Sequence, residues 1–224
     1  MNLLSKVERI ERKWALHNAT RSQFLIAILR NKLCFTKEYD SRKVNSIYFD
    51  DTNLNSLYEN INGNTLKAKY RVRWYGNSKK IVNPQFEIKM KKGILSKKRV
   101  FRLDNKFDRI SDESLKYLTT EVNNILKLKK NINPVLSTHY ERDYFISSNK
   151  KIRCTLDDNL ESIQLGYLKN YLIKKKFFRL VLEMKYNSEY DEYVRKNLSD
   201  LSDSRLSKNS KYLLSAIDDK FITN

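Results

Sequence analysis

Hydrophobic and polar residues alternate along many short stretches of this chain, which is the pattern of half-buried β-strands. Successive side chains of an extended chain point to opposite faces, so each such strand has one apolar and one polar face. The alternation predicts about eight strands, near residues 6–16, 43–50, 65–75, 84–91, 96–104, 135–147, 150–158 and 176–186.

Three other segments have the 3.6-residue periodicity of amphipathic helices. In the first, residues 20–33, Thr20 is a candidate N-cap and Phe24 and Ile28 belong to an apolar stripe. The other two cover residues 112–130 and 188–200. Because the helices interrupt the strands instead of alternating with them, we expect an α+β fold with antiparallel pairing. No linker or internal repeat divides the chain, which predicts one domain over residues 1–224.

The polar faces of the predicted strands are unusually basic. In TLKAKYRVRWYG, residues 65–76, one face carries the row Lys67, Lys69, Arg71 and Arg73. Like charges about 4 Å apart repel by about 4 kcal/mol at an effective dielectric constant of about 20, so such a row is costly without an anion. Basic faces recur in four further segments, which are QFEIKMKK, HYERDYF, KKIRCTLDD and LVLEMKY.

A solvated outer face would explain the basic residues of any single strand. Across five strands this explanation weakens, because the carboxylates are few. Two functional interpretations remain, an open platform for nucleic acid and a closed barrel with a polar interior. Platforms for single strands stack bases on aromatic residues of the basic face. Two tyrosines, Tyr140 and Tyr144, meet that requirement, but the apolar faces hold most of the large aromatic residues, namely Tyr70, Trp74, Phe86 and Phe178. This distribution favours the barrel.

Composition agrees with a polyanionic partner. The 45 Lys and Arg residues against 26 Asp and Glu give a formal net charge of +19, which attracts nucleic acid, anionic membranes or phosphate polymers. No apolar run reaches the roughly 18 residues of a membrane span, and the first residues lack the apolar core of a signal peptide. We therefore expect a soluble, cytoplasmic protein.

The sequence offers little for several common kinds of site. Cys34 and Cys154 are too few and too far apart for a disulfide framework or a zinc site, so we expect buried free thiols. Only two histidines occur, and a structural role is expected for His139 on its predicted strand. No Gly-x-x-x-x-Gly-Lys segment is present, which excludes a P-loop.

Several spaced segments resemble one known family. They are RKVNSIYFDDTNLNSLYENINGNTLKAKYRVRWYG, FEIKMKKGILSKKRVF, HYERDYF, KIRCTLDD, LVLEMKY and the SKY of residues 210–212. In this order, along nearly the whole chain, they resemble the VTC domain of polyphosphate polymerases, which belongs to the triphosphate tunnel metalloenzymes. The resemblance implies an antiparallel barrel of about eight strands, with a tunnel lined by Arg, Lys and Glu. The basic row would then face a polyphosphate chain.

The resemblance also implies individual site residues. Arg71 and Arg73 resemble a pair that clamps phosphates, a task suited to the guanidinium fork. One lysine of LSKKRVF joins them, and we choose Lys98 over Lys97, although a slip of one residue would reverse that face. Lys69 comes from the row itself. The remaining predicted catalytic or substrate-binding residues are Lys13, Lys89, Tyr140, Arg142, Arg153, Ser210 and Lys211.

Glu183 of LVLEMKY resembles the family's metal ligand, and Glu11 and Glu87 are second candidates. Proteins hold Mg²⁺ and Mn²⁺ with one or two carboxylates together with phosphate oxygens. The segment RIERK, residues 9–13, has an arginine where the superfamily commonly has the first glutamate of Glu-x-Glu-x-Lys. One carboxylate is thereby lost, which weighs against a second metal site.

The function implied by the resemblance is transfer of the γ-phosphoryl group of ATP to a growing polyphosphate chain, with Mn²⁺ or Mg²⁺ as cofactor. ATP and inorganic polyphosphate are the expected partners, without specific nucleic acid binding and without a membrane span. The alternatives are an inorganic triphosphatase and a polyphosphate- or polyanion-binding module without turnover.

Overall fold

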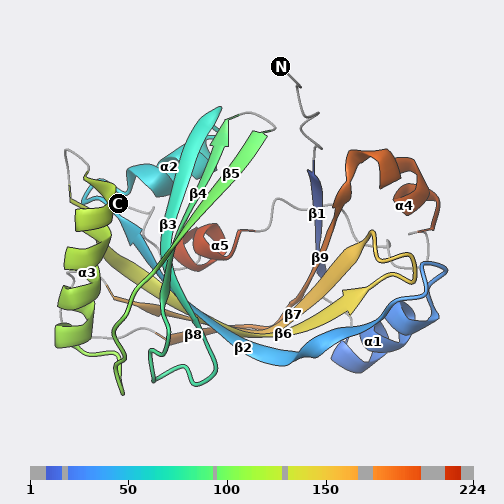
Figure 1. The fold of residues 1–224 in the computed structure, drawn as a ribbon, viewed down its shortest axis with the longest axis horizontal. Coiled ribbons are helices and arrows are strands. Elements are labelled where there is room, and N and C mark those ends of the chain that lie inside the picture. Colours follow the sequence, from blue (N-terminus) through green and yellow to red (C-terminus); the bar gives the residue numbers. More distant parts are fainter. Residues whose placement is uncertain are drawn as a thin grey trace. The chain divides into compact units, whose positions relative to one another are not determined.

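The computed structural model of the chain describes residues 9–16, 20–92, 95–127, 131–165, 174–197 and 210–217. These residues include nine strands (Figure 1), which are β1 Arg9–Leu16, β2 Thr36–Asp50, β3 Leu66–Tyr75, β4 Gln85–Lys92, β5 Leu95–Arg102, β6 Asn133–Ile146, β7 Arg153–Gln164, β8 Lys174–Phe177 and β9 Leu180–Asn187. The helices are α1 Arg21–Arg30, α2 Asn55–Ile61, α3 Asp112–Leu126, α4 Asp191–Asn197 and α5 Lys211–Ile217, with a 3₁₀ turn η1 at Ser188–Tyr190.

The strands form a sheet in the order β1-β9-β7-β6-β2-β3-β4-β5, and β8 pairs with β7. The pairings of β1 and β7 with β9 are antiparallel, as are those that join β2, β3, β4 and β5 in succession. The predicted α+β class, with an antiparallel sheet and flanking helices, is confirmed. None of the described helices is long and apolar enough to cross a membrane.

The described residues belong to two compact units. The first unit takes its residues from the ranges 1–42, 141–160 and 177–209, and the second from 43–140, 161–176 and 210–224. Strands β2, β6 and β7 each contribute residues to both units. The single domain expected from the sequence stays a prediction.

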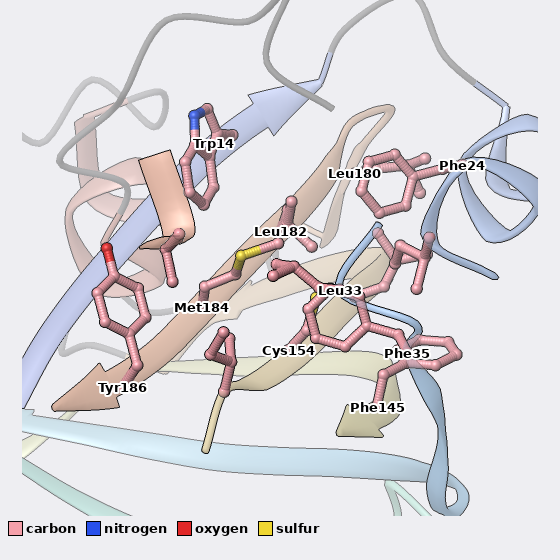
Figure 2. Packing of buried hydrophobic residues seen from close by; sticks show 14 residues of the cluster. Trp14, Phe24, Leu33, Phe35, Phe145, Cys154, Leu180, Leu182, Met184 and Tyr186 are labelled. Carbon is pink, nitrogen blue, oxygen red and sulfur yellow. The ribbon is translucent and has the colours of Figure 1, made fainter. Parts of the chain in front are cut away.

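The core of the first unit is formed by the apolar faces of β1, β7 and β9 together with α1 and α4. Helix α1 begins with the predicted cap, in which Thr20 and Gln23 form a reciprocal capping box, and it buries Phe24 and Ile28. Figure 2 shows Phe24 from α1 and Leu182 and Met184 from β9 within this cluster. The alternate residues of β9 and β1 are thereby left on the other face of the strands.

The core of the second unit lies between α3 and the apolar face of β3 and β4. Trp74 and Phe86 are completely buried there with Leu118 and Val122 of α3, which confirms the predicted apolar faces of both strands. The buried His139 ring contacts Asn45 and Ser137 through its two nitrogens and lies beside Trp74. Burial lowers the pKa of His139 to about 4, so the ring is neutral near pH 7.

Several sequence predictions need correction. The predicted strand 176–186 is two strands, and Phe178, which was expected on an apolar face, is 91% exposed at the break between them. Strand β2 begins at Thr36, earlier than predicted. The sequence did not indicate its first half, because that half is polar on both faces and shows no alternation. Helix α2 was not predicted. The free thiol of Cys154 is buried, but that of Cys34 is exposed. Residues 6–8, 128–130 and 198–200 of predicted elements lie outside the described residues.

Candidate functional site

The second unit has a continuous basic face on β3, β4 and β5. Arg71 lies opposite Glu87, and Lys89 lies opposite both Lys69 and Lys98 in the strand register. Directly paired residues of antiparallel strands project to the same side. The predicted row therefore shares one face with Glu87, while the opposite face packs on α3.

The buried carboxylate of Glu87 is the centre of this face. It is 3% exposed, and its Oε2 lies 2.6 Å from Nη2 and 2.7 Å from Nε of Arg71. Its Oε1 lies 2.5 Å from Nζ of Lys98, and Nη1 of Arg73 is 3.9 Å from Oε2. Burial alone would raise the pKa of Glu87, but the three cations lower it to about 2. Glu87 is thus an ionised counter-ion that fixes the neighbouring cations.

The register also separates the two candidate lysines of β5. Lys98 lies opposite Lys89 and contacts Glu87, whereas Lys97 lies opposite Met90. Met90 is on the apolar face that packs against the core of the second unit. The structure therefore places Lys98, and not Lys97, with the charged cluster.

Residues from β6 and from the start of α5 meet the same face. Nη2 of the buried Arg73 donates a hydrogen bond of 3.3 Å to the hydroxyl of Tyr140. Nζ of Lys211 lies 4.4 Å from the centre of the Tyr140 ring, a cation–π contact. Nζ of Lys69 donates to Oγ of Ser210 at 2.8 Å. Ser210 and Lys211, predicted as site residues, therefore lie beside the basic row.

The first unit has its own charged face, on β1, β9 and β7. Glu183 lies opposite Lys13 on one side and Thr155 on the other, and Lys185 lies opposite Arg153 in the register of β7 and β9. These side chains project away from the core of this unit, to which the alternate residues of β9 belong.

Glu183 has the same central position here that Glu87 has in the second unit. It is 5% exposed, its Oε2 lies 3.2 Å from Nζ of Lys13, and its Oε1 contacts Nζ of Lys185. Nζ of Lys13 also lies 2.8 Å from Oε1 of Glu11, so this ammonium group bridges two carboxylates. Burial alone would raise the pKa of Glu183, but Lys13, Lys185 and Arg142 hold it well below its usual range. Glu183 is therefore ionised.

The two predicted arginines of this unit differ in their environment. Arg142 is held by a bidentate ion pair with the buried Asp157, with contacts of 2.5 and 2.7 Å. The side chain of Arg153 is 63% exposed, and its Nε lies 3.3 Å from Oε1 of Glu38. Arg142 is fixed in place, whereas Arg153 is open to solvent.

Two residues of this face were not among the predicted site residues. Lys185 contacts Glu183 directly, and the strand alternation of LVLEMKY was the signal that could have found it, because residues two apart share a face. The hydroxyl of Thr155 is buried, and no described group bonds to it. The alternation of KKIRCTLDD places Thr155 on the same face as Arg153, but nothing in the sequence distinguishes its hydroxyl from that of an ordinary strand threonine.

The predicted site residues thus form one cluster in each unit. Lys69, Arg71, Arg73, Glu87, Lys89, Lys98, Tyr140, Ser210 and Lys211 are in the second unit, and Glu11, Lys13, Arg142, Arg153 and Glu183 are in the first. The cations of the second unit surround the buried Glu87, and those of the first unit pair with the buried Glu183 and Asp157. Fixed donors of this kind are suited to phosphate oxygens, because they need little reorganisation when an anion arrives.

Comparison with known proteins agrees with this geometry. A family model described as the VTC domain matches residues 8–216. Two solved structures of similar fold are a candidate adenylate cyclase from Vibrio parahaemolyticus and a candidate adenylyl cyclase from Hippeastrum with a dominant triphosphatase activity. Each is 11% identical with a TM-score of 0.53, and the matches cover 94% and 93% of this chain and 99% and 96% of theirs. Both likenesses are of fold, and they agree with the predicted antiparallel α+β class.

Proposed function

Because the chain belongs to the VTC domain family, we propose that it transfers the γ-phosphoryl group of ATP to the end of an inorganic polyphosphate chain and releases ADP. The observation that carries this proposal is the cluster around Glu87. There Arg71 and Arg73 of β3 and Lys98 of β5 are held on one face of the sheet. Polyphosphate carries a negative charge on every unit, so a row of cations spaced along strands matches it. The same groups would bind the phosphates of ATP.

Phosphoryl transfer asks a protein mainly for positioning and for stabilisation of charge. In the second unit Arg71 and Arg73 would hold phosphate oxygens through the paired N–H groups of their guanidinium ends. Further positive charge would come from the lysines Lys69, Lys89, Lys98 and Lys211. In the first unit Lys13, Arg142, Arg153 and Lys185 would do the same. This chemistry needs no histidine base, and the neutral, buried His139 is accounted for by its structural contacts.

The triphosphate tunnel fold suggests dependence on a divalent metal ion. The first unit fits such an ion, because Glu183 is ionised, Glu11 lies across Lys13 from it, and the Thr155 hydroxyl opposite Glu183 bonds to no described group. The described residues hold no cluster of three or more histidine, cysteine or carboxylate side chains able to bind a metal. Water and phosphate oxygens would therefore complete the coordination, as is usual for Mg²⁺.

We propose that Glu183, with Glu11 beside it, holds Mn²⁺ or Mg²⁺. The ion would offset phosphate charge during transfer. Glu87 remains the second candidate, since its carboxylate is also ionised.

A triphosphatase is the second candidate function. It is favoured by the dominant triphosphatase activity of the Hippeastrum protein, which shares the fold. The same clusters would then bind a triphosphate, and water would accept the phosphoryl group in place of a polyphosphate end. A binding module without turnover is the third possibility, and it would need the cations but not the metal.

Replacing Glu183 separates binding from catalysis. We expect the wild-type protein with Mn²⁺ or Mg²⁺ to release ADP from ATP, and Glu183→Gln to lose about 100-fold or more of this turnover. Tripolyphosphate binding, measured by calorimetry without metal, should be as tight as in the wild type or tighter, because a negative charge has left a basic cluster. Glu192→Gln, at an exposed carboxylate of α4, is the matched control and should change neither property.

The outcomes discriminate among the three functions. A wild-type protein that binds tripolyphosphate but turns over neither ATP nor tripolyphosphate would be a binding module. Release of inorganic phosphate without polyphosphate would favour the triphosphatase. If metal-dependent turnover persists in Glu183→Gln, the metal ion must be held by Glu11 or Glu87 instead.

A further inference from the structure

Asp50, at the end of β2, connects two helices of the second unit. Its carboxylate accepts hydrogen bonds of 2.9 Å from the backbone N–H groups of Ser56 and Leu57, in the first turn of α2. It also accepts a bond of 2.6 Å from the hydroxyl of Tyr212 in α5, a residue 162 positions away in the chain. Asp50 is 3% exposed, so these contacts are shielded from water.

The position of Asp50 is fixed independently of α5. Helix α2 begins after Leu54, which has a φ of 53° and supplies no side-chain cap. The first N–H groups of a helix have no partner within the helix, and here Asp50 provides one from the neighbouring strand. Both Asp50 and the start of α2 are thereby held in place on the sheet, ready to receive the Tyr212 hydroxyl.

Helix α5 is short and relies on tertiary contacts for its position. It has only seven residues, and helices shorter than about 12–15 residues are marginal without tertiary packing. Its packing comes from Tyr212, which is buried and stacks on Tyr48 at 4.9 Å between ring centres, and from Ala216 beside Leu57. The ring supplies the apolar contact, and the hydroxyl supplies the directional one.

Tyr212 directly follows Ser210 and Lys211, the two residues that lie against the basic row. Ser210 contacts Lys69, and Lys211 contacts the ring of the buried Tyr140. A rotation of α5 about the Tyr212 ring would move both side chains away from the row. The hydrogen bond to Asp50 opposes that rotation.

We propose that the bond between Tyr212 and Asp50 is a positioning contact that holds Ser210 and Lys211 in the phosphate-binding row. The proposal rests on the proposed function, because it assumes that this row binds phosphate chains. Tyr212 itself touches no substrate in this role. It determines whether Lys211 is in place when a phosphate chain arrives. The proposal also gives a role to Asp50 of the segment IYFDDTN, for which the sequence suggested none.

A double-mutant cycle tests the contact, with tripolyphosphate binding measured by calorimetry. Tyr212→Phe keeps the ring stack and removes only the hydroxyl, so we expect the fold to persist and the affinity to fall about 10-fold, equivalent to about 1.4 kcal/mol. Lys211→Ala should lower the affinity by a similar factor. The double variant should bind only slightly more weakly than Lys211→Ala alone, because most of the effect of the hydroxyl passes through that lysine and the remainder through Ser210.

Two controls separate positioning from general loss of structure. Tyr58→Phe, at an exposed tyrosine of α2, should leave the affinity unchanged. Arg153→Ala should weaken binding additively with Tyr212→Phe, because Arg153 belongs to the first unit and is paired there with Glu38.

Full affinity of Tyr212→Phe, or losses that multiply in the Tyr212→Phe/Lys211→Ala variant, would overturn the positioning role while leaving the proposed function intact. A wild-type protein that fails to bind tripolyphosphate would overturn the proposed function and this inference together. If Tyr212→Phe lowers the melting temperature strongly, binding is measured well below that temperature beside Leu118→Ala, a destabilised control at a buried residue of α3 in the other core of the second unit, which should bind normally. Weak binding by Leu118→Ala would mean that loss of stability alone lowers the affinity, which would also contradict the positioning role.

Discussion

Replacing Glu87 by glutamine should destabilise the protein and strengthen its binding of phosphate chains. A pKa lowered from 4.5 to about 2 corresponds to about 3 kcal/mol of folding stability near neutral pH. Removing one partner of a buried ion pair commonly costs about 3–5 kcal/mol, which is consistent with the value from the pKa. The side chain of Lys98 is 49% exposed, so most of this cost comes from Arg71 and Arg73. A loss of about 3 kcal/mol lowers the melting temperature by about 6–12 °C in a protein of this size.

The pH dependence gives the prediction a second signature. The folded-state pKa of Glu87 lies below its unfolded value, so the stabilising contribution is present above pH 4.5 and is lost as the pH falls from 4.5 toward about 2. The difference in melting temperature between wild type and Glu87→Gln should therefore be largest above pH 5 and shrink in that window. Glu192→Gln, with 80% of its side chain exposed, should lower the melting temperature by less than about 2 °C.

The assay is thermal unfolding with and without tripolyphosphate. A ligand at 100 times its dissociation constant adds about 2.7 kcal/mol to stability, and the variant should reach that point at a lower tripolyphosphate concentration than the wild type. A Glu87→Gln variant that melts like the wild type at pH 7 would contradict this prediction. A variant that is destabilised but binds tripolyphosphate more weakly would contradict it too, since the loss of fixed arginine positions would then outweigh the gain in net positive charge.

Three further results are expected. Turnover should fall about 100-fold in each of the variants Arg71→Ala, Arg73→Ala and Arg153→Ala. It should change little in Lys79→Ala or Lys80→Ala, which replace exposed lysines after Gly76. Equal losses in both sets would mean that net charge alone binds the substrate. Lys98→Ala should weaken tripolyphosphate binding and Lys97→Ala should not, as titration calorimetry of the two neighbours would show; the reverse result would contradict the strand register. Tripolyphosphate should raise the melting temperature much more than single-stranded DNA at the same salt concentration, and equal shifts would indicate a nucleic-acid binder.

The faces of β3 and β4 could be predicted because their signal is local. Trp74 and Phe86 alternate with charged residues at a period of two, and a strand with that pattern has a single apolar face to pack against a core. The same rule could have included Lys185, which stands two residues after Glu183. The resemblance to the VTC domain supplied the roles of the site residues, which alternation alone does not provide.

The features that the sequence did not reveal lack a local periodicity that would mark them. Helix α2 has no capping side chain at Leu54, and its first N–H groups bond to Asp51 and Asp50, which precede it. The first half of β2 is polar on both faces, so no alternation marks it. The pairing of each cation with Glu87 or Glu183 follows from the register between strands, which a single sequence leaves open.

The most direct test of the proposed function is the product formed from ATP by the purified protein. With ATP labelled at the γ-phosphate and with Mn²⁺, we expect a ladder of labelled polyphosphate on a denaturing gel and an equivalent amount of ADP. Arg71→Ala should form about 100-fold less of both products. Labelled inorganic phosphate as the sole product, or unchanged ATP, would contradict the account.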